Sequence, residues 1–203
     1  MTDEAQVQSA FAVCAREFGG LDILVANAGI ASSAPIEETT VALWRKNYDV
    51  LAQGYFLTCR AAFPLLKLQK GGSIIFIGSK NALAATPGAS AYASAKAASL
   101  HLARCLALEG APDGIRVNVV NPDAVIRGSH IWDGEWRQER AGAYGIDPGE
   151  ELEEFYKNRS MLKRSVLPED VAEAVFFFAS DASAKSTGNI INVDAGNAQA
   201  FTR

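Results

Sequence analysis

The chain has 203 residues, a formal net charge of −4 and 49% hydrophobic residues. This length suits one domain with a full-sized core, so we expect a single domain over residues 1–203. No cluster of basic residues indicates nucleic-acid binding, and no apolar run approaches the roughly 20 residues that cross a bilayer. The acidic N-terminus is unlike a signal peptide, and we expect a cytoplasmic protein without nucleic-acid or membrane partners.

The three cysteines, Cys14, Cys59 and Cys105, lie far apart, and each falls within a helical pattern. Their odd number and the lack of a Cys-x-x-Cys pair argue against a disulfide framework and against a zinc site. We therefore expect buried thiols in a reducing compartment, and no metal centre.

Helical and strand patterns alternate along the chain. Apolar residues at helical spacing, bounded by capping residues, Gly or Pro, predict helices near residues 3–18, 35–68, 90–109, 148–161 and 168–179. Short apolar or β-branched runs followed by turn signals predict strands at residues 21–26, 73–77, 115–120 and 189–193. Pro64 should kink the second helix or mark a late turn in it.

This alternation predicts an α/β fold with a parallel sheet and helices on both faces. Several strands are continuously apolar, as expected of strands covered on both sides. Ligands of such sheets bind beyond the carboxyl ends of the strands, where Asn27, Ser79 and Asn121 fall. Residues 123–167 contain no clear strand, and a long insertion at this place is typical of a lid over a binding site.

The stretch from Ser79 to Lys96 carries the clearest chemistry. A serine follows an apolar strand, and Tyr92 and Lys96 lie four residues apart in the next helix, hence on one face. A phenol and an ammonium beside a hydroxyl can transfer a proton. Each residue taken alone also fits an ordinary role: a strand-end cap, a half-buried aromatic and a solvated charge.

Four features in order resemble the short-chain dehydrogenase/reductase family over essentially the whole chain. They are Asn27-Ala28-Gly29 after a strand, a serine thirteen residues before a tyrosine, Tyr92-x-x-x-Lys96, and Asn121-Pro122 at the end of the next strand. The resemblance implies the C-terminal portion of a Rossmann-type, doubly wound parallel sheet. It also implies an oxidoreductase that uses NAD or NADP.

The family's roles carry over to matching positions. Tyr92 would be the general base, Lys96 would favour its phenolate by lowering the phenol pKa and would hold the nicotinamide ribose, and Ser79 would bond the substrate oxygen. The cofactor-binding residues implied are Asn27, Ala28, Gly29, Tyr92, Lys96, Pro122, Asp123 and Val125. Substrate contacts are expected from Ser79, Asn81, His130 and Trp132. Trp132 and Trp136 could wall the lid or belong to the core.

Several segments resemble one branch, the dehydrogenase half of bifunctional rhamnulose-phosphate aldolase/lactaldehyde dehydrogenase proteins. They include residues 79–82, 101–105, 121–125, 128–132, 143–146, 153–156 and the terminal Phe201-Thr202-Arg203. This resemblance implies a role in rhamnose catabolism and a substrate such as lactaldehyde or another small hydroxy-aldehyde.

The chain departs from the family at four places. Leu51 replaces the asparagine of the proton relay, Asp123 replaces the glycine after Pro122, and Arg127 replaces a threonine that binds the cofactor. The family's Gly-rich phosphate turn has no counterpart, because Gly19-Gly20 and Gly71-Gly72 precede strands. We therefore expect the adenosine and pyrophosphate site to be largely missing, and the strand at 21–26 to form an apolar edge.

Two functions remain open at this point. One is a dehydrogenase with its chemistry at Ser79, Tyr92 and Lys96. The other is a non-catalytic half-domain that serves assembly, because the phosphate turn is absent. The family commonly forms oligomers through the helices at 40–69 and 90–109, and the resemblance implies a homo-oligomer here.

Overall fold

The structure is a computed structural model that describes residues 1–201. Its centre is a four-stranded parallel sheet in the order β1-β2-β3-β4. The strands are β1 (Ile23–Ala26), β2 (Gly72–Ile77), β3 (Ile115–Pro122) and β4 (Ile190–Val193). This confirms the predicted α/β class and all four strands. Thr202 and Arg203, from the terminal motif, lie outside the described residues.

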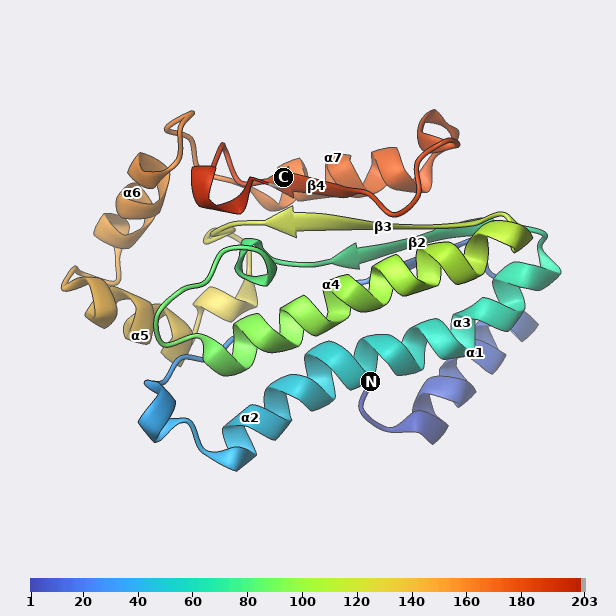
Figure 1. Ribbon diagram of the computed structural model, residues 1–203, viewed down its shortest axis with the longest axis horizontal. Coiled ribbons are helices and arrows are strands. Elements are labelled where there is room, and N and C mark those ends of the chain that lie inside the picture. The colour runs from blue at the N-terminus through green and yellow to red at the C-terminus, as the bar shows by residue number, and fades with distance from the viewer. Residues whose placement is uncertain (202–203) are drawn as a thin grey trace.

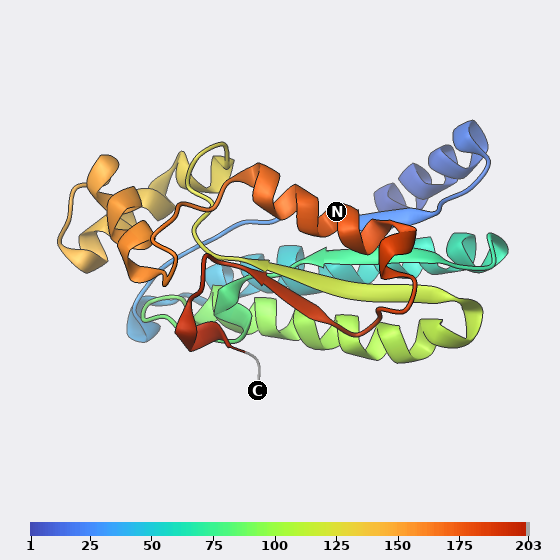
Figure 2. The same ribbon diagram turned by 90° about the horizontal axis from the view of Figure 1, so that it is seen from above.

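Helices cover both faces of the sheet (Figures 1 and 2). α3 (Gly54–Leu68) and α4 (Ser90–Gly110) lie on one face, and α7 (Pro168–Ala179) lies on the other. α1 (Glu4–Phe18), capped by the side chain of Asp3, packs on α3. The main core lies between the sheet and α3 and α4, and it includes Tyr55, Phe76 and Val117.

The second helical region is not one continuous helix. α2 (Val41–Tyr48) leads into a wide turn of π-helix at Asp49–Gln53, and α3 follows directly. Pro64 lies inside α3, which continues to Leu68. The wide turn carries Leu51 at its centre with no exposed surface, so the irregularity in this region falls beside the strand ends and not at the proline.

Residues 123–167 form a helical layer beyond the carboxyl ends of the strands (Figure 1). It contains α5 (Glu135–Tyr144) and α6 (Glu150–Arg159). α6 was predicted, whereas α5 was not. The buried residues of α5 are Trp136, Arg140 and Ala141. Because one of them is charged, the buried face does not show the apolar periodicity by which an amphipathic helix is recognised in a sequence.

β1 is an edge strand, as the sequence predicted, because within residues 1–201 it pairs with β2 alone. Ile23 and Val25 on this strand are 44% and 41% exposed. Cys59 is buried, and Cys14 and Cys105 are partly buried, all as free thiols. Among the described residues, no helix combines the length and the apolar character needed to cross a membrane.

Candidate active site

Three strand ends meet at one edge of the sheet. The register places Ala26 beside Phe76 and Ile77 beside Val120, so the residues after β1 and β2 lie level with the end of β3. Asn121 ties two of these ends together, because its Oδ1 accepts a hydrogen bond from the backbone N–H of Ser79 at 3.0 Å. A Cβ at Gly78 would lie 2.0 Å from that oxygen, and this close approach requires glycine.

A cavity of about 500 Å³ opens at this edge. Every residue that the sequence predicted for catalysis, cofactor or substrate lines it: Asn27, Ala28, Gly29, Ser79, Asn81, Tyr92, Lys96, Pro122, Asp123, Val125, His130 and Trp132. The residues come from the ends of three strands, the start of α4 and the layer of residues 123–167. The pocket size is in the range of small-molecule sites.

Tyr92 is held in an apolar part of the wall. It is 8% exposed, clusters with Leu51 and Ala95, and packs against the ring of Trp136 at a centroid distance of 5.8 Å. Burial raises the pKa of the phenol, and a hydrogen bond with Ser79 opposes this shift. Ser79 and Tyr92 are therefore close enough to act on one substrate oxygen.

Lys96 is also buried, and the hydrogen bonds of its Nζ go to the end of β2 and to Tyr55, not to the phenol of Tyr92. Nζ donates to the carbonyl oxygen of Ile77 at 2.7 Å and to the hydroxyl of Tyr55 at 3.4 Å. Burial lowers the pKa of Lys96 to about 7. The pKa of Tyr92 is raised in this structure because desolvation outweighs the hydrogen bond with Ser79. The expected effect of Lys96 on this pKa stays a prediction.

Leu51 occupies the position of the relay asparagine and packs against Tyr92. Asn47, one turn earlier, does not take its place. Its Nδ2 donates to Ser32 Oγ at 2.8 Å and to the carbonyl of Leu43 at 2.9 Å, which fixes α2 to the loop after β1. Leu51 offers no polar group for a relay, and the buried Oδ1 of Asn47 has no hydrogen-bond partner within the described residues.

Aromatic residues of the 123–167 layer form the outer wall. Trp132 and Trp136 are 6% and 8% exposed, and they both line the cavity and belong to a local core with Leu152. The two tryptophans thus both line the cavity and pack in a core, and the function of this layer as a lid stays a prediction. His130 lines the cavity at its rim, with its exposed imidazole paired with Asp133 at 2.9 Å.

Two departures from the family take clear roles. The Oδ2 of Asp123 accepts hydrogen bonds from Arg159 and from Asn197, each at 2.8 Å, so the carboxylate is neutralised locally. Arg127 pairs with Glu153 at 2.9 Å and does not line the cavity.

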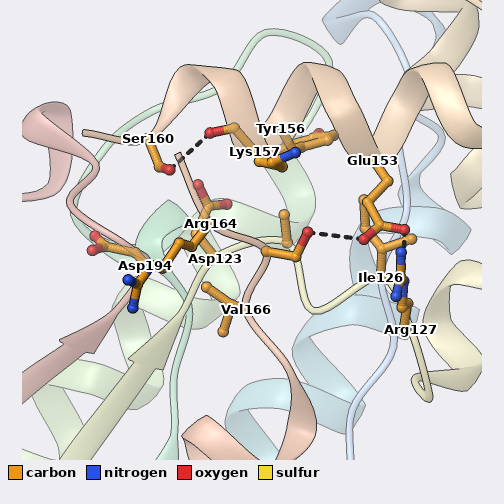
Figure 3. A pocket seen from close by; sticks show the side chains of 12 residues that line it. Asp123, Ile126, Arg127, Glu153, Tyr156, Lys157, Ser160, Arg164, Val166 and Asp194 are labelled. Carbon is orange, nitrogen blue, oxygen red and sulfur yellow. Dashed lines mark hydrogen bonds and ion pairs between the residues drawn. The ribbon is translucent and has the colours of Figure 1, made fainter. Parts of the chain in front are cut away.

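A second, smaller pocket lies behind Asp123 and under α6 (Figure 3). Its volume is about 20 Å³, which is close to the space that one water molecule needs.

Sequence reasoning missed the cationic part of the wall. Lys80, Arg140 and Arg159 line the cavity together with Thr86 and Tyr156. Lys80 directly follows Ser79 in the sequence, so of these three residues it was the one that the sequence could most easily have placed at the site. Arg140 and Arg159 lie on separate helices, and nothing in their spacing shows that they face one another.

The residues at the sheet edge fit the nicotinamide end of a dinucleotide. The side of the cavity formed by Asn27, Ala28 and Gly29 has little side-chain bulk, and a Cβ at Gly29 would lie 4.0 Å from Lys96 Nζ. A sugar or ring could therefore lie against this backbone, within reach of the ammonium. Within residues 1–201, no Gly-rich turn leads from a strand directly into a helix N-terminus.

Comparisons with known proteins agree with this arrangement. A family model described as enoyl-(acyl carrier protein) reductase matches residues 1–198. The uncharacterized oxidoreductase YuxG of Bacillus subtilis (strain 168) is 53% identical over 204 residues, which cover 100% of this chain and 30% of YuxG. The chain thus spans less than a third of the length of this relative.

Solved structures show the same fold. Sorbitol-6-phosphate 2-dehydrogenase SrlD from Erwinia amylovora superposes with a TM-score of 0.90 at 32% identity, over 99% of this chain and 77% of that one. A 7α-hydroxysteroid dehydrogenase complexed with NADH and 7-oxo glycochenodeoxycholic acid superposes with a TM-score of 0.83 at 28% identity, over 98% and 72%. The chain therefore belongs to the short-chain dehydrogenase/reductase family of oxidoreductases.

Proposed function

We propose that the chain is an NAD- or NADP-dependent oxidoreductase domain that acts on a small hydroxy-aldehyde or alcohol, with lactaldehyde as the first candidate. One observation carries the proposal: Ser79, Tyr92 and Lys96 line a single cavity at the carboxyl ends of parallel strands. Dinucleotides bind to such folds at this edge. In this proposal residues 1–203 form a single domain. Residues 123–167 are its lid, which encloses Tyr92 on the outer side of the cavity.

Each polar residue has a distinct role in the proposal. The phenol of Tyr92 takes the hydroxyl proton of the substrate, or returns it in the reverse reaction. Ser79 holds the substrate oxygen beside that phenol, and Lys96 holds the nicotinamide ribose. A bound nicotinamide would accept or supply the hydride. Asn27, Ala28, Gly29, Pro122, Asp123 and Val125 form the cofactor side of the cavity.

The substrate side of the cavity is formed by Asn81, His130 and Trp132. Trp132 and Trp136 exclude water from the region above Tyr92, which strengthens electrostatic interactions there. Burial raises the pKa of the Tyr92 phenol, so the bound substrate and cofactor must favour its phenolate for the phenol to act as the base. The ammonium of Lys96, one turn along α4 from Tyr92, is the cationic group of this wall to which the proposal assigns stabilisation of the phenolate.

The experiment is a turnover assay of the full chain with NAD and NADP. Lactaldehyde, 1,2-propanediol and glyceraldehyde serve as substrates, and formation or consumption of the reduced cofactor is followed. The proposal expects turnover with at least one of them. Absence of turnover together with no calorimetric binding of either dinucleotide would favour the second candidate.

That second candidate is an assembly module, and one observation favours it. The outer surface of α2, α3 and α4 exposes Trp44, Phe56 and Leu108 at 37%, 45% and 80%. A groove of about 490 Å³ between α3 and α4 is lined in part by Phe56, Leu57 and Leu102. We infer that the helices at 40–69 and 90–109 form a homo-oligomer interface, which also suits a dehydrogenase.

Sedimentation of wild type and of Phe56→Asp tests the interface. A charged residue at the rim of this groove should shift the chain towards the monomer. Phe201→Asp, at an exposed aromatic that is not part of these helices, should leave the oligomer unchanged. Equal sedimentation of all three proteins contradicts the proposed interface.

A further inference from the structure

The cavity contains more positive charge than its own residues neutralise. Four cationic side chains line it, and the single lining carboxylate among the described residues is Asp123. The cations are Lys80, Lys96, Arg140 and Arg159. Asp123 is already engaged by Arg159, whose Nη2 lies 2.8 Å from Oδ2. Lys80 and Arg140 remain to be explained.

Lys80 is 5% exposed and lies directly after Ser79. Its Nζ donates to Thr86 Oγ1 at 2.9 Å, and Thr86 donates in turn to Asn81 Oδ1 at 2.7 Å. Within residues 1–201, no carboxylate forms an ion pair with this ammonium. A buried ammonium with one neutral partner is poorly compensated.

Arg140 is 1% exposed and is held rigidly. Its guanidinium lies against the rings of Trp136 and Tyr144 at 5.4 and 4.9 Å, and it donates to the carbonyl of Pro87 at 3.0 Å and to the Tyr144 hydroxyl at 2.6 Å. Its Nε is buried and has no acceptor in the described part of the chain. A carboxylate, the usual partner of a buried guanidinium, is missing here as well.

The phenol of Tyr144 partly takes the place of that carboxylate. It accepts from Arg140 at 2.6 Å and from Arg159 at 3.5 Å. Burial raises the pKa of Tyr144, but the hydrogen bond and the charge of Arg140 outweigh it, and the net pKa is lowered. Two guanidinium groups thus share one phenol, and within residues 1–201 no carboxylate forms an ion pair with Arg140.

We propose that this side of the cavity is a subsite for an anionic group of the substrate, a carboxylate or a phosphate, with Lys80 and Arg140 supplying the charge. The inference rests on the proposed function, because it names the substrate class of the same site. Ser79, Tyr92 and Lys80 line the same cavity, so a short molecule can place its hydroxyl at Ser79 and Tyr92 and its anionic group at Lys80. Neutral lactaldehyde lacks the second contact, and an anionic hydroxy compound has both.

The test compares matched substrates on the wild-type full chain. 3-Hydroxybutyrate is paired with 2-butanol for a carboxylate, and glycerol 3-phosphate with glycerol for a phosphate. The value of kcat/KM for an anionic member should exceed that of its neutral partner by roughly tenfold or more, and the difference should shrink with added salt. The better of the two pairs identifies the anion. Equal values within both pairs overturn the subsite and leave the proposed oxidoreductase intact.

Variants then assign the charge. Lys80→Met should raise KM for the anionic substrate by roughly ten- to hundredfold, raise KM for the neutral partner much less, and be rescued in part by Lys80→Arg. Lys157→Met, a lysine of α6 that does not line the cavity, is the matched control and should behave as wild type. A rise in the KM of the dinucleotide, with an unchanged KM for the substrate, would instead assign Lys80 to a cofactor phosphate and overturn the proposal.

Calorimetry of 3-hydroxybutyrate and inorganic phosphate separates this inference from the proposed function. Binding to the wild-type chain that is lost in Lys80→Met supports the subsite even if no substrate is turned over. No binding of either anion, beside turnover of a neutral alcohol, refutes the subsite alone.

Discussion

Lys96 and Tyr55 share one acceptor, the carbonyl oxygen of Ile77. Lys96 Nζ lies 2.7 Å and the Tyr55 hydroxyl 3.0 Å from this oxygen, and the two donors lie 3.4 Å apart. Tyr55 has no exposed surface. The end of β2 therefore fixes the ammonium on the cavity wall through a backbone oxygen and a buried phenol, in a region where Leu51 offers no polar group.

Tyr55→Phe removes one acceptor of the charged ammonium and should lower the pKa of Lys96 further. If turnover needs Lys96 protonated, its fall with rising pH should then begin at a lower pH than in wild type. The loss of one buried hydrogen bond should also cost ~1 kcal/mol of unfolding free energy. The measurement is kcat/KM against pH. If the pH profile of kcat/KM is unchanged while the stability falls as expected, Tyr55 serves the packing of the core and does not influence the pKa of Lys96.

Lys96→Met tests the burial of the ammonium in the cofactor-free chain. The folded pKa of about 7 lies below the ordinary value of 10.5, so the unfolded state binds more protons between these values and stability rises with pH across this window. Lys96→Met should abolish this rise and should stabilise the chain at pH 6 by up to ~5 kcal/mol, at about 1.36 kcal/mol per pKa unit. At a pH above 10.5 the two proteins should differ little.

Urea unfolding at pH 6 and at pH 9 measures this difference. Lys46→Met on α2 is the control, because its exposed ammonium should leave the pH dependence of wild type unchanged. Parallel pH dependences of wild type and Lys96→Met would show that the ammonium keeps its ordinary pKa.

Leu51→Asn introduces the residue that the family places at the wide turn. The side chain of Leu51 has no exposed surface and packs among Ile30, Val50, Ala95 and other mostly apolar neighbours. An amide there should cost ~1–3 kcal/mol of unfolding free energy, because a buried polar group lacks a partner. Leu51→Met, which keeps the volume, should cost less than ~1.5 kcal/mol. An unchanged stability of Leu51→Asn would reveal an acceptor or a water at this position.

Much of the fold followed from local patterns. Ile74, Ile75 and Phe76 form a run that only a doubly covered strand explains, and Asn27, Ser79 and Asn121 were placed at one edge by parallel topology alone. Both inferences need only the period of the apolar residues and the direction of the strands. The predicted site residues gathered in one cavity for the same reason.

The cationic wall could not be predicted in this way. Arg140 approaches Tyr144 within α5, but it meets Pro87 across 53 residues of chain, and Arg159 meets Asp123 across 36. Such contacts depend on how the layer of residues 123–167 folds over the sheet. The buried state of Lys96 was also out of reach, because desolvation is set by the packing of Leu51, Tyr55 and Ile77 and not by the motif.

Turnover by Tyr92→Phe is the sharpest test of Tyr92 as the general base. Tyr48→Phe, a partly buried tyrosine of α2 stacked on Trp44, is the matched control. We expect Tyr92→Phe to lower kcat by ~10²–10⁴-fold, the usual contribution of a general acid–base group, while the unfolding free energy and the calorimetric affinity for the dinucleotide stay near those of wild type. Turnover by Tyr92→Phe equal to that of wild type and Tyr48→Phe would contradict it.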